Sequence, residues 1–404
     1  MVLLILAKLS LGQVHSLSYY IEQAKVSSPL IRGLQNQVLS NQIDSQILRA
    51  GYRPQVNFQA NNSYAPVIGG YGYDNAISNG ANITNLVQAR KDFISKGYMG
   101  SLQKGINLQS QSLRDTIKLT EKDLTRTITD QYILAYSDLL SMDYSQEILQ
   151  LLQNEDDALK RLTRENVYKQ TDYLSFAVTL QQQELSYLQT QILYNSDFLV
   201  LNYLAGITDT TIVRLEDPKL KETGFPDLFN TVFYTRYTTD SLRIANEHRL
   251  IDYSYKPKFG VFGDAGYNSS LQYLPYKNFG FSAGFGLTVP IYDGGQKLMK
   301  HNKLVLEEQT RIANRDFFLG QYKIQILQLF QQLHATNNLL GKINRQIEFS
   351  NTLINADLKM LETGDVKMTD LILAINNYDN ARNLLLQNNI SRLRIINQIN
   401  YFNP

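Results

Sequence analysis

The stretch FSAGFGLTVPIYDGGQKL, Phe281–Leu298, changes its pattern in the middle. Up to Ile291, apolar residues alternate strictly with small or polar ones, which is the spacing of a strand with two different faces. From Leu298 onward an apolar residue falls at every seventh position as far as Leu361, which is the spacing of a helix. The sequence therefore predicts a short strand that leads directly into a very long helix, from about residue 294 to residue 362.

Three residues form the predicted strand-to-helix junction, namely Pro290, Gly294 and Gly295. Proline ends the pairing of a strand because it has no N–H group, and glycine adopts backbone angles that other residues avoid. The helix that follows would stretch about 100 Å at 1.5 Å per residue. We therefore expect a rod rather than a core helix of a compact domain.

Composition agrees with long helices and excludes several classes of site. The 404 residues include nine prolines, and none falls within 67–217 or 291–403. Proline is excluded from helix interiors, so these windows leave room for rods. The absence of cysteine excludes disulfides and thiolate metal sites. A net charge of +2 without a basic stripe argues against a nucleic-acid binder, and we expect no such partner.

Residues 1–15 resemble a shortened signal segment, with an apolar run from Val2 to Ala7 followed by Lys8. The alternative is an ordinary apolar helix start. No stretch of the chain reaches the roughly 18 apolar residues that a membrane-spanning helix needs. If the protein crosses a membrane, the sequence predicts that it does so with strands.

Two pairs of segments indicate an internal duplication. YRPQVNFQANNSY at Tyr52–Tyr64 matches YKPKFGVFGDAGY at Tyr255–Tyr267, at an offset of 203 residues. KQTD at Lys169–Asp172 matches KMTD at Lys367–Asp370, at an offset of 198 residues. The sequence therefore predicts two copies of one structural plan.

Each copy is predicted to contain a helix, two strands, a very long helix and a returning helix. The first repeat spans 16–205, a linker spans 206–226, and the second repeat spans 227–402. The first helices are expected at about 17–50 and 227–253, and the clear strands at 56–64, 259–267 and 281–291. The fourth strand is hidden, and we expect it within Gly97–Leu108.

Short strands that alternate apolar with small or polar residues are typical of a transmembrane barrel. The predicted lipid-facing residues are Phe281, Phe285, Leu287 and Val289, and tyrosines at the strand ends would form the interfacial girdle. The alternative is a small soluble sheet with one buried face. A barrel in lipid must close, and four strands are too few, so three chains would have to supply twelve.

Three motifs carry a resemblance to a known family. VPIYDGG at Val289–Gly295, LNYLAGI at Leu201–Ile207 and ETGDVKMTDLILA at Glu362–Ala374 resemble the TolC-type outer membrane efflux proteins. The resemblance implies a mixed, mainly α fold. In it, long coiled-coil-like helices form a periplasmic α-barrel joined to a transmembrane β-barrel that is completed by trimerisation.

The same resemblance implies the function. It predicts the outer-membrane exit duct of a tripartite efflux or type I secretion system in a Gram-negative bacterium, with its helices in the periplasm. The homotrimer would be a passive channel that contacts outer-membrane lipid and docks with a periplasmic adaptor protein and an inner-membrane transporter. No cofactor and no enzymatic activity are implied.

The duplicated Lys-x-Thr-Asp turns are the predicted aperture residues. In one interpretation their oxygens only cap the returning helices. In the other, which follows from the resemblance, three copies of Asp370 form a ring at the periplasmic mouth. The family's tyrosine and arginine latch positions fall on Leu361 and Val366, so lysines would supply the ion pairs instead. The predicted set is Lys169, Thr171, Asp172, Lys367, Thr369 and Asp370.

Two other function classes remain open from the residues alone. A structural coiled-coil protein of the cell envelope, without a pore, would explain the rods but would not need duplicated strands. An enzyme would need a catalytic constellation, and the sequence contains no paired nucleophile and base. The histidines at 15, 248, 301 and 334 are scattered in the sequence, so we predict no metal site.

Overall fold

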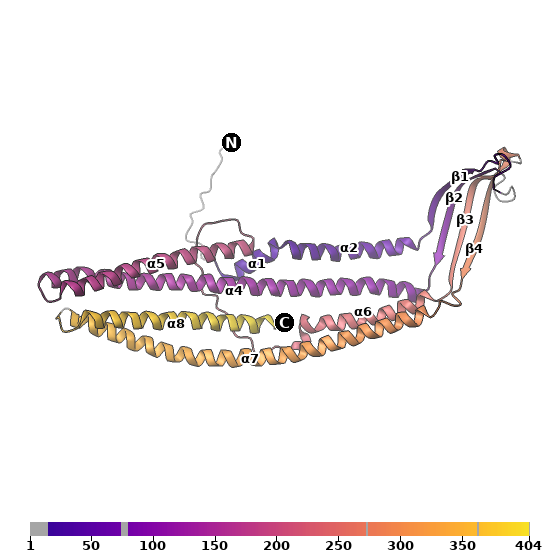
Figure 1. The fold of residues 1–404 in the computed structure, drawn as a ribbon. Coiled ribbons are helices and arrows are strands. Elements are labelled where there is room, and N and C mark those ends of the chain that lie inside the picture. Colours follow the sequence, from indigo (N-terminus) through magenta and orange to yellow (C-terminus); the bar gives the residue numbers. More distant parts are fainter. Residues whose placement is uncertain (1–14, 74–79, 272–273, 362, 404) are drawn as a thin grey trace, which may run out of the picture. The chain divides into compact units, whose positions relative to one another are not determined.

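The computed structural model describes residues 15–73, 80–271, 274–361 and 363–403, so nearly all of the predicted signal segment lies outside the described residues. The chain is mainly helical and carries one small sheet (Figure 1). The helices are α1 Leu17–Ser27, α2 Pro29–Gly51, α4 Lys96–Arg164, α5 Gln170–Ala205, α6 Val232–Ser254, α7 Gln296–Leu361 and α8 Met368–Tyr401. The strands are β1 Gln55–Tyr64, β2 Ala81–Phe93, β3 Lys258–Ser269 and β4 Phe279–Thr288.

One order of elements occurs twice along the chain. Helix α2, strands β1 and β2, the long helix α4 and helix α5 are followed by α6, β3, β4, the long helix α7 and α8. The long helices have 69 and 66 residues. This order is consistent with the predicted duplication. Among the described residues, no helix is both long enough and apolar enough to span a membrane.

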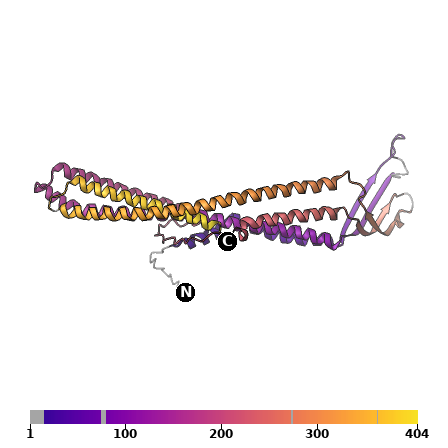
Figure 2. The ribbon, with the colours of Figure 1, turned by 90° about the horizontal axis from the view of Figure 1, so that it is seen from below.

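The chain divides into two compact units, and each takes segments from both predicted repeats. The helical unit comprises the residues up to Arg32, Ile117–Tyr234 and the residues from Phe317 onward. The sheet unit comprises Gly33–Thr116 and Thr235–Asp316. Figure 2 gives a second view of the same elements.

The sheet has four antiparallel strands in the order β1-β2-β3-β4. Its central pair joins β2 to β3, with Val87 opposite Ala265, so strands of the two predicted repeats are hydrogen-bonded to each other. Within the described part of the chain, β1 and β4 have no strand on their outer sides. Both edges therefore present unpaired backbone groups.

The fourth strand is not where the sequence predicted it. Gly97–Leu108 is helical and belongs to α4, and the strand is β2, which ends at Phe93. Its alternation was hidden because Asn85 and Lys91 interrupt the apolar face. In the predicted segment one glycine, Gly97, allows close packing of two helices. A Cβ at Gly97 would lie 2.2 Å from the hydroxyl of Tyr253 on α6.

Other boundaries differ by a few residues, for local reasons. Strand β4 ends at Thr288 rather than Ile291, because Pro290 cannot continue the ladder. The first predicted helix is two helices, α1 and α2, with extended backbone at Ser28 before Pro29. Proline disfavours a helical conformation in the preceding residue and fits the first turn of a new helix.

The two faces of the sheet differ in polarity. Residues directly opposite one another share a face, and successive residues alternate between faces. One face, called here the apolar face, carries Val56, Phe58, Ala60, Tyr64, Ile83, Val87, Phe93, Phe259, Val261, Ala265, Tyr267, Phe279, Phe281, Ala283, Phe285 and Leu287. The polar face carries Gln55, Asn57, Gln59, Asn61, Asn82, Thr84, Gln88, Arg90, Asp92, Lys258, Asp264, Asn268, Ser282 and Thr288.

The core of the helical unit consists of three apolar clusters. The first joins the ends of α4 and α7 to the starts of α5 and α8 around Phe176, Leu361 and Leu371. The second packs α1, α4 and α5 around Tyr20 and Tyr132. The third joins the start of α6, the middle of α7 and the end of α8. Because each cluster joins elements far apart in the sequence, together they hold the rods side by side.

The turns from α4 to α5 and from α7 to α8 have the same geometry. Asn166 and Gly364, 198 residues apart, both adopt left-handed backbone with φ of 62° and 77°. The next residue donates its N–H to a carbonyl of the preceding helix, at 2.9 Å from Val167 to Leu162 and at 3.0 Å from Asp365 to Met360. This bonding pattern is a Schellman helix end, which satisfies carbonyls that the helix leaves unpaired.

We expect Gly364→Ala and Gly341→Ala to have opposite effects on stability. A Cβ at Gly364 would meet Val167 Cγ1 at 2.7 Å and would strain the left-handed backbone, at a cost of about 1–2 kcal/mol. Gly341 lies inside α7 with nothing within 4 Å of its Cβ position, so alanine there should stabilise the protein by about 0.5–1 kcal/mol. The thermal unfolding midpoints of the purified variants measure both effects, and a lower midpoint for Gly341→Ala would contradict the helix assignment.

Candidate functional site

The two turns between the rods, 165–169 and 363–367, are called here the tip turns. Tyr168 links them, because its hydroxyl lies 3.2 Å from the carbonyl oxygen of Leu361 and 3.1 Å from that of Val366. The ring is buried in the first apolar cluster with Phe176 and Met368. The structure therefore brings the two predicted Lys-x-Thr-Asp turns together. The sequence analysis missed Tyr168, although it directly precedes the first motif.

The two aspartates of the motif have different surroundings. Asp172 is half-buried, and its Oδ2 accepts the backbone N–H of Lys169 at 3.2 Å, which helps to cap α5. Asp370 is exposed at the start of α8, and its side chain forms no hydrogen bond or ion pair within the part of the chain that the structure describes. Capping therefore accounts for Asp172 and leaves the carboxylate of Asp370 available.

A second carboxylate lies close to Asp370. Asp357, near the end of α7, is buried with 8% of its surface exposed. Burial, with a smaller contribution from the negative charge of Asp370, raises the pKa of Asp357 above its ordinary value. The exposed Asp370 therefore disfavours the charged form of Asp357.

The other predicted residues of the motif are Lys169, Thr171, Lys367 and Thr369, and all four are exposed. Within residues 15–73, 80–271, 274–361 and 363–403, neither lysine forms an ion pair. The link between the two turns of one chain is the Tyr168 hydroxyl rather than a lysine ion pair. Ion pairs from these lysines to other copies of the chain remain a prediction.

The strand-to-helix junction is built around a residue that the sequence analysis missed. Asp293 accepts the N–H of Gly295 at 2.9 Å and that of Lys297 at 2.6 Å, so it caps the start of α7. A hydrogen bond from Tyr255 and these backbone bonds lower the pKa of Asp293. The predicted Gly294 and Gly295 have φ of 67° and 81°, as their role requires. An aspartate just before a helical pattern is a cap signal, and it was readable.

The predicted lipid-facing residues are exposed in the chain. Phe281, Phe285 and Leu287 lie on the apolar face, with exposed fractions of 89%, 75% and 62%. Val289 lies just beyond the end of β4. On the polar face, Ser282 donates to Asp264 Oδ2 at 2.8 Å. The sheet therefore exposes large apolar side chains on one face and hydrogen-bonded polar ones on the other.

Two histidines that are far apart in the sequence meet in the sheet unit. His248 and His301 are stacked, with 2.7 Å between their Nδ1 atoms, and His301 Nε2 lies 3.3 Å from Asp252. The interpretation of the histidines as scattered was therefore wrong for this pair. In the described part of the chain no three such side chains are arranged to hold a metal ion.

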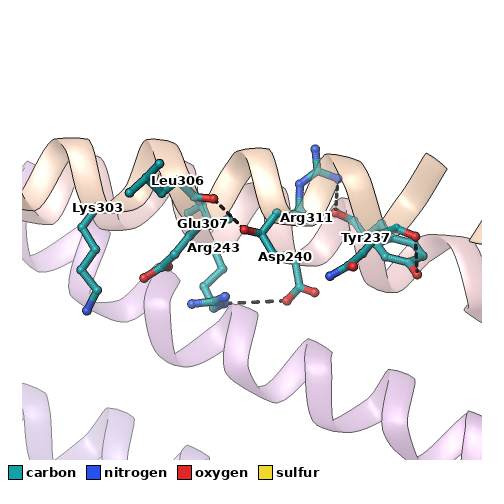
Figure 3. A pocket seen from close by; sticks show the side chains of 10 residues that line it. Tyr237, Asp240, Arg243, Lys303, Leu306, Glu307 and Arg311 are labelled. Carbon is teal, nitrogen blue, oxygen red and sulfur yellow. Dashed lines mark hydrogen bonds and ion pairs between the residues drawn. The ribbon is translucent and has the colours of Figure 1, made fainter. Parts of the chain in front are cut away.

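A groove of about 490 Å³ runs between α6 and α7 in the sheet unit (Figure 3). Three charged residues of its lining, Asp240, Arg243 and Arg311, are paired, whereas Lys303 and Glu307 form no ion pair within the described residues. Arg243 lies 3.8 Å from Asp240 and 2.8 Å from Glu247, and Arg311 bonds Glu308 at 2.7 Å and the carbonyl of Tyr237 at 3.2 Å. The ion pairs of Arg243 lie within α6 and the pair of Arg311 with Glu308 lies within α7, while the bond from Arg311 to the Tyr237 carbonyl joins the two helices.

No family model matches the chain, and no curated protein matches it. Solved structures do match over nearly the whole length. A structure of CusC, studied for transmembrane channel formation, has a TM-score of 0.78 at 11% identity and covers 97% of this chain and 93% of its own. The chain has the fold of the TolC-type outer membrane channels.

Two further structures support the TolC-type fold. The CmeC outer membrane channel of Campylobacter jejuni has a TM-score of 0.75 at 12% identity, over 96% of this chain and 85% of that one. The open state of the MtrE outer membrane channel of Neisseria gonorrhoeae has a TM-score of 0.74 at 12% identity, over 96% and 88%. The predicted family resemblance and the predicted mainly helical fold with a small sheet are thereby confirmed.

We expect Asp357→Asn to stabilise the protein at neutral pH. The folded pKa of Asp357 is raised, so the native state holds this proton more tightly than the unfolded chain does. Stability is therefore lost as pH rises from about 3.9 through the folded pKa. Asparagine removes that loss, so the thermal midpoint should be higher than wild type at pH 7 and similar at pH 4. Asp365→Asn, exposed in the turn that follows α7, is the control; a gain that does not depend on pH would contradict this account.

Proposed function

We propose that the chain is one protomer of an outer-membrane exit duct, a passive channel of a tripartite efflux or type I secretion system in a Gram-negative bacterium. The observation that carries the proposal is the sheet. Its edges lack strand partners within the described chain, and its apolar face is exposed, so a single copy leaves both unsatisfied. The TolC-type fold supports the same conclusion.

Three copies would satisfy both requirements at once. Placed edge to edge, four strands from each copy make a twelve-stranded barrel in which every backbone group is paired, as a bilayer requires. The apolar face would then contact outer-membrane lipid and the polar face would line an aqueous lumen. The helices would continue below it as a periplasmic tube, with the tip turns at its far end.

The partners follow from this arrangement. A passive duct needs an energy-coupled pump elsewhere, so we propose an inner-membrane transporter joined to the tip turns by a periplasmic adaptor. The similar structures are channels, which supports a function without catalysis. The alternative is a coiled-coil protein of the cell envelope without a pore. It does not explain why the apolar face of the sheet is exposed.

The facing of the strands provides the test of this function. Leu287→Arg would place a charge on the apolar face, which at the bilayer midplane costs about 2–4 kcal/mol. We expect this variant to lose the heat-modifiable trimer from the outer-membrane fraction, while Ser282→Arg on the polar face retains it. Fractionation followed by gel electrophoresis with and without heating measures both. A soluble wild-type protein, or normal assembly of Leu287→Arg alone, would overturn the proposal.

The tip turns should control ion selectivity. A ring of three Asp370 carboxylates in a narrow mouth would attract cations, and salt would screen this over a Debye length of about 8–10 Å. We expect Asp370→Asn to reduce cation preference and Lys367→Ala to raise conductance in single-channel recordings of the reconstituted trimer. Asp44→Asn, exposed on α2, is the matched control. Unchanged selectivity and conductance in both tip variants would leave these residues with a capping role only.

A further inference from the structure

The sheet unit contains two adjoining cavities where its strands meet its helices. The first has a volume of about 430 Å³. It is lined by the end of β2, the start of β3 and the end of β4, by Tyr52 after α2, and by the start of α4 and the end of α6. The second, of about 590 Å³, lies between α4 and α6. They share Tyr253 and Lys256, so we treat them as one basic cavity. None of the predicted site residues lines it.

Positive charge predominates in the basic cavity. Its lining includes five cations and two carboxylates, namely Arg90, Lys104, Arg249, Lys256, Lys258, Asp92 and Asp252. Both carboxylates are already paired, since Arg90 Nε lies 3.1 Å from Asp92 and Lys297 Nζ lies 2.9 Å from Asp252.

The remaining four cations have no carboxylate partner. Lys104, Arg249, Lys256 and Lys258 form no ion pair within the residues that the structure describes. In the groove of Figure 3, by contrast, Arg243 and Arg311 are each paired with a glutamate. Arg249, Lys256 and Lys258 are exposed and Lys104 is half-buried, so an anion that enters the basic cavity would meet cations that no carboxylate of the described chain neutralises.

Flat aromatic surfaces line the same cavity. Tyr52, Tyr98 and Tyr253 come from three different segments, and the rings of Tyr98 and Tyr253 lie 5.9 Å apart with a tilt of 34°. Lys256 Nζ lies 4.5 Å above the Tyr253 ring. The Tyr253 hydroxyl packs where a side chain of residue 97 would be, because a Cβ at Gly97 would lie 2.2 Å from that hydroxyl. The tyrosine surface is therefore built into the packing of α4 against α6.

We propose that the basic cavity binds a small aromatic anion, a ring that carries a carboxylate or sulfonate. The ring would lie against Tyr98 and Tyr253, and the anionic group would accept hydrogen bonds from Lys256 and Lys258. A cavity of about 430 Å³ has the size of a small-molecule site, and its few polar groups would fix the orientation of the ligand. The lysines recognise the charge and the tyrosines recognise the flat apolar body.

The position of the cavity relative to the faces of the sheet determines what binding there would do. Arg90, Lys258 and Thr288 of its lining lie on the polar face of the sheet, and Phe93, Phe259 and Val261 lie on the apolar face. If the polar face lines a lumen, the cavity is a binding site for aromatic anions on the inner wall of the duct. This consequence rests on the proposed function, whereas the binding itself does not.

The test is calorimetric titration of 2-naphthoate into the purified full-length protein in detergent. We expect naphthoate to bind about ten-fold more tightly than 2-naphthol, which has the same rings without the charge, and than inorganic phosphate, which has charge without rings. Equal affinity for naphthol would reduce the site to an apolar surface. Equal affinity for phosphate would make it a general anion site, such as one for lipid headgroups, and either result would overturn the proposal.

The variants test the residues. Lys258→Gln should weaken naphthoate binding about five- to ten-fold, and Lys258→Arg should restore most of it. Lys277→Gln is the matched control for Lys256→Gln, because Lys277 lies over the Tyr276 ring, at 5.7 Å, as Lys256 lies over the Tyr253 ring, but outside the cavity. If Lys258→Gln does not assemble, Lys256→Gln provides the second measurement. Unchanged binding in the glutamine variants would overturn the proposal, and a conducting trimer that binds no naphthoate would overturn this inference alone.

Discussion

The open edges of the sheet are the constraint on which the rest of this structure depends. A strand edge presents a row of backbone N–H and C=O groups, and lipid offers them no partner. Within the described chain β1 and β4 leave two such edges, and the apolar face beside them is exposed. Burying the face inside the chain would not pair the edges, and pairing the edges alone would not cover the face. The proposed closure with further copies in a membrane would do both.

The repetition of elements follows from the same constraint. The two central strands, β2 and β3, come from different halves of the chain, so neither half alone forms the sheet. The two ends of the rods repeat the Schellman geometry at Asn166 and Gly364, and the buried Tyr168 hydroxyl joins them. The two halves of the chain therefore contact each other at the sheet, through β2 and β3, and at the tip turns, through Tyr168.

Much of the fold was readable from the sequence because its signals are periodic. Strict alternation over 281–288 fixed strand β4, and the seven-residue apolar repeat fixed α7 to within two residues at its start. Strand β2 was missed because Asn85 and Lys91 occupy its apolar face. Tyr168 and the His248–His301 pair were missed because their roles depend on partners distant in sequence, whereas the cap signal of Asp293 was local and readable. Periodicity reports burial along one element and says little about contacts between elements.

The distribution of paired and unpaired charge separates structural from functional polar groups in this chain. Beside the groove, Arg243 is paired with Glu247 within α6 and Arg311 is paired with Glu308 within α7. Asp370 at the tip turns, and Lys104, Arg249, Lys256 and Lys258 at the sheet end, have no such partners in the described residues. Leaving like charges close together costs folding free energy, so they persist where something else compensates them. In the proposed duct, ions of the solution that fills it would supply this compensation, cations at Asp370 and anions at the lysines.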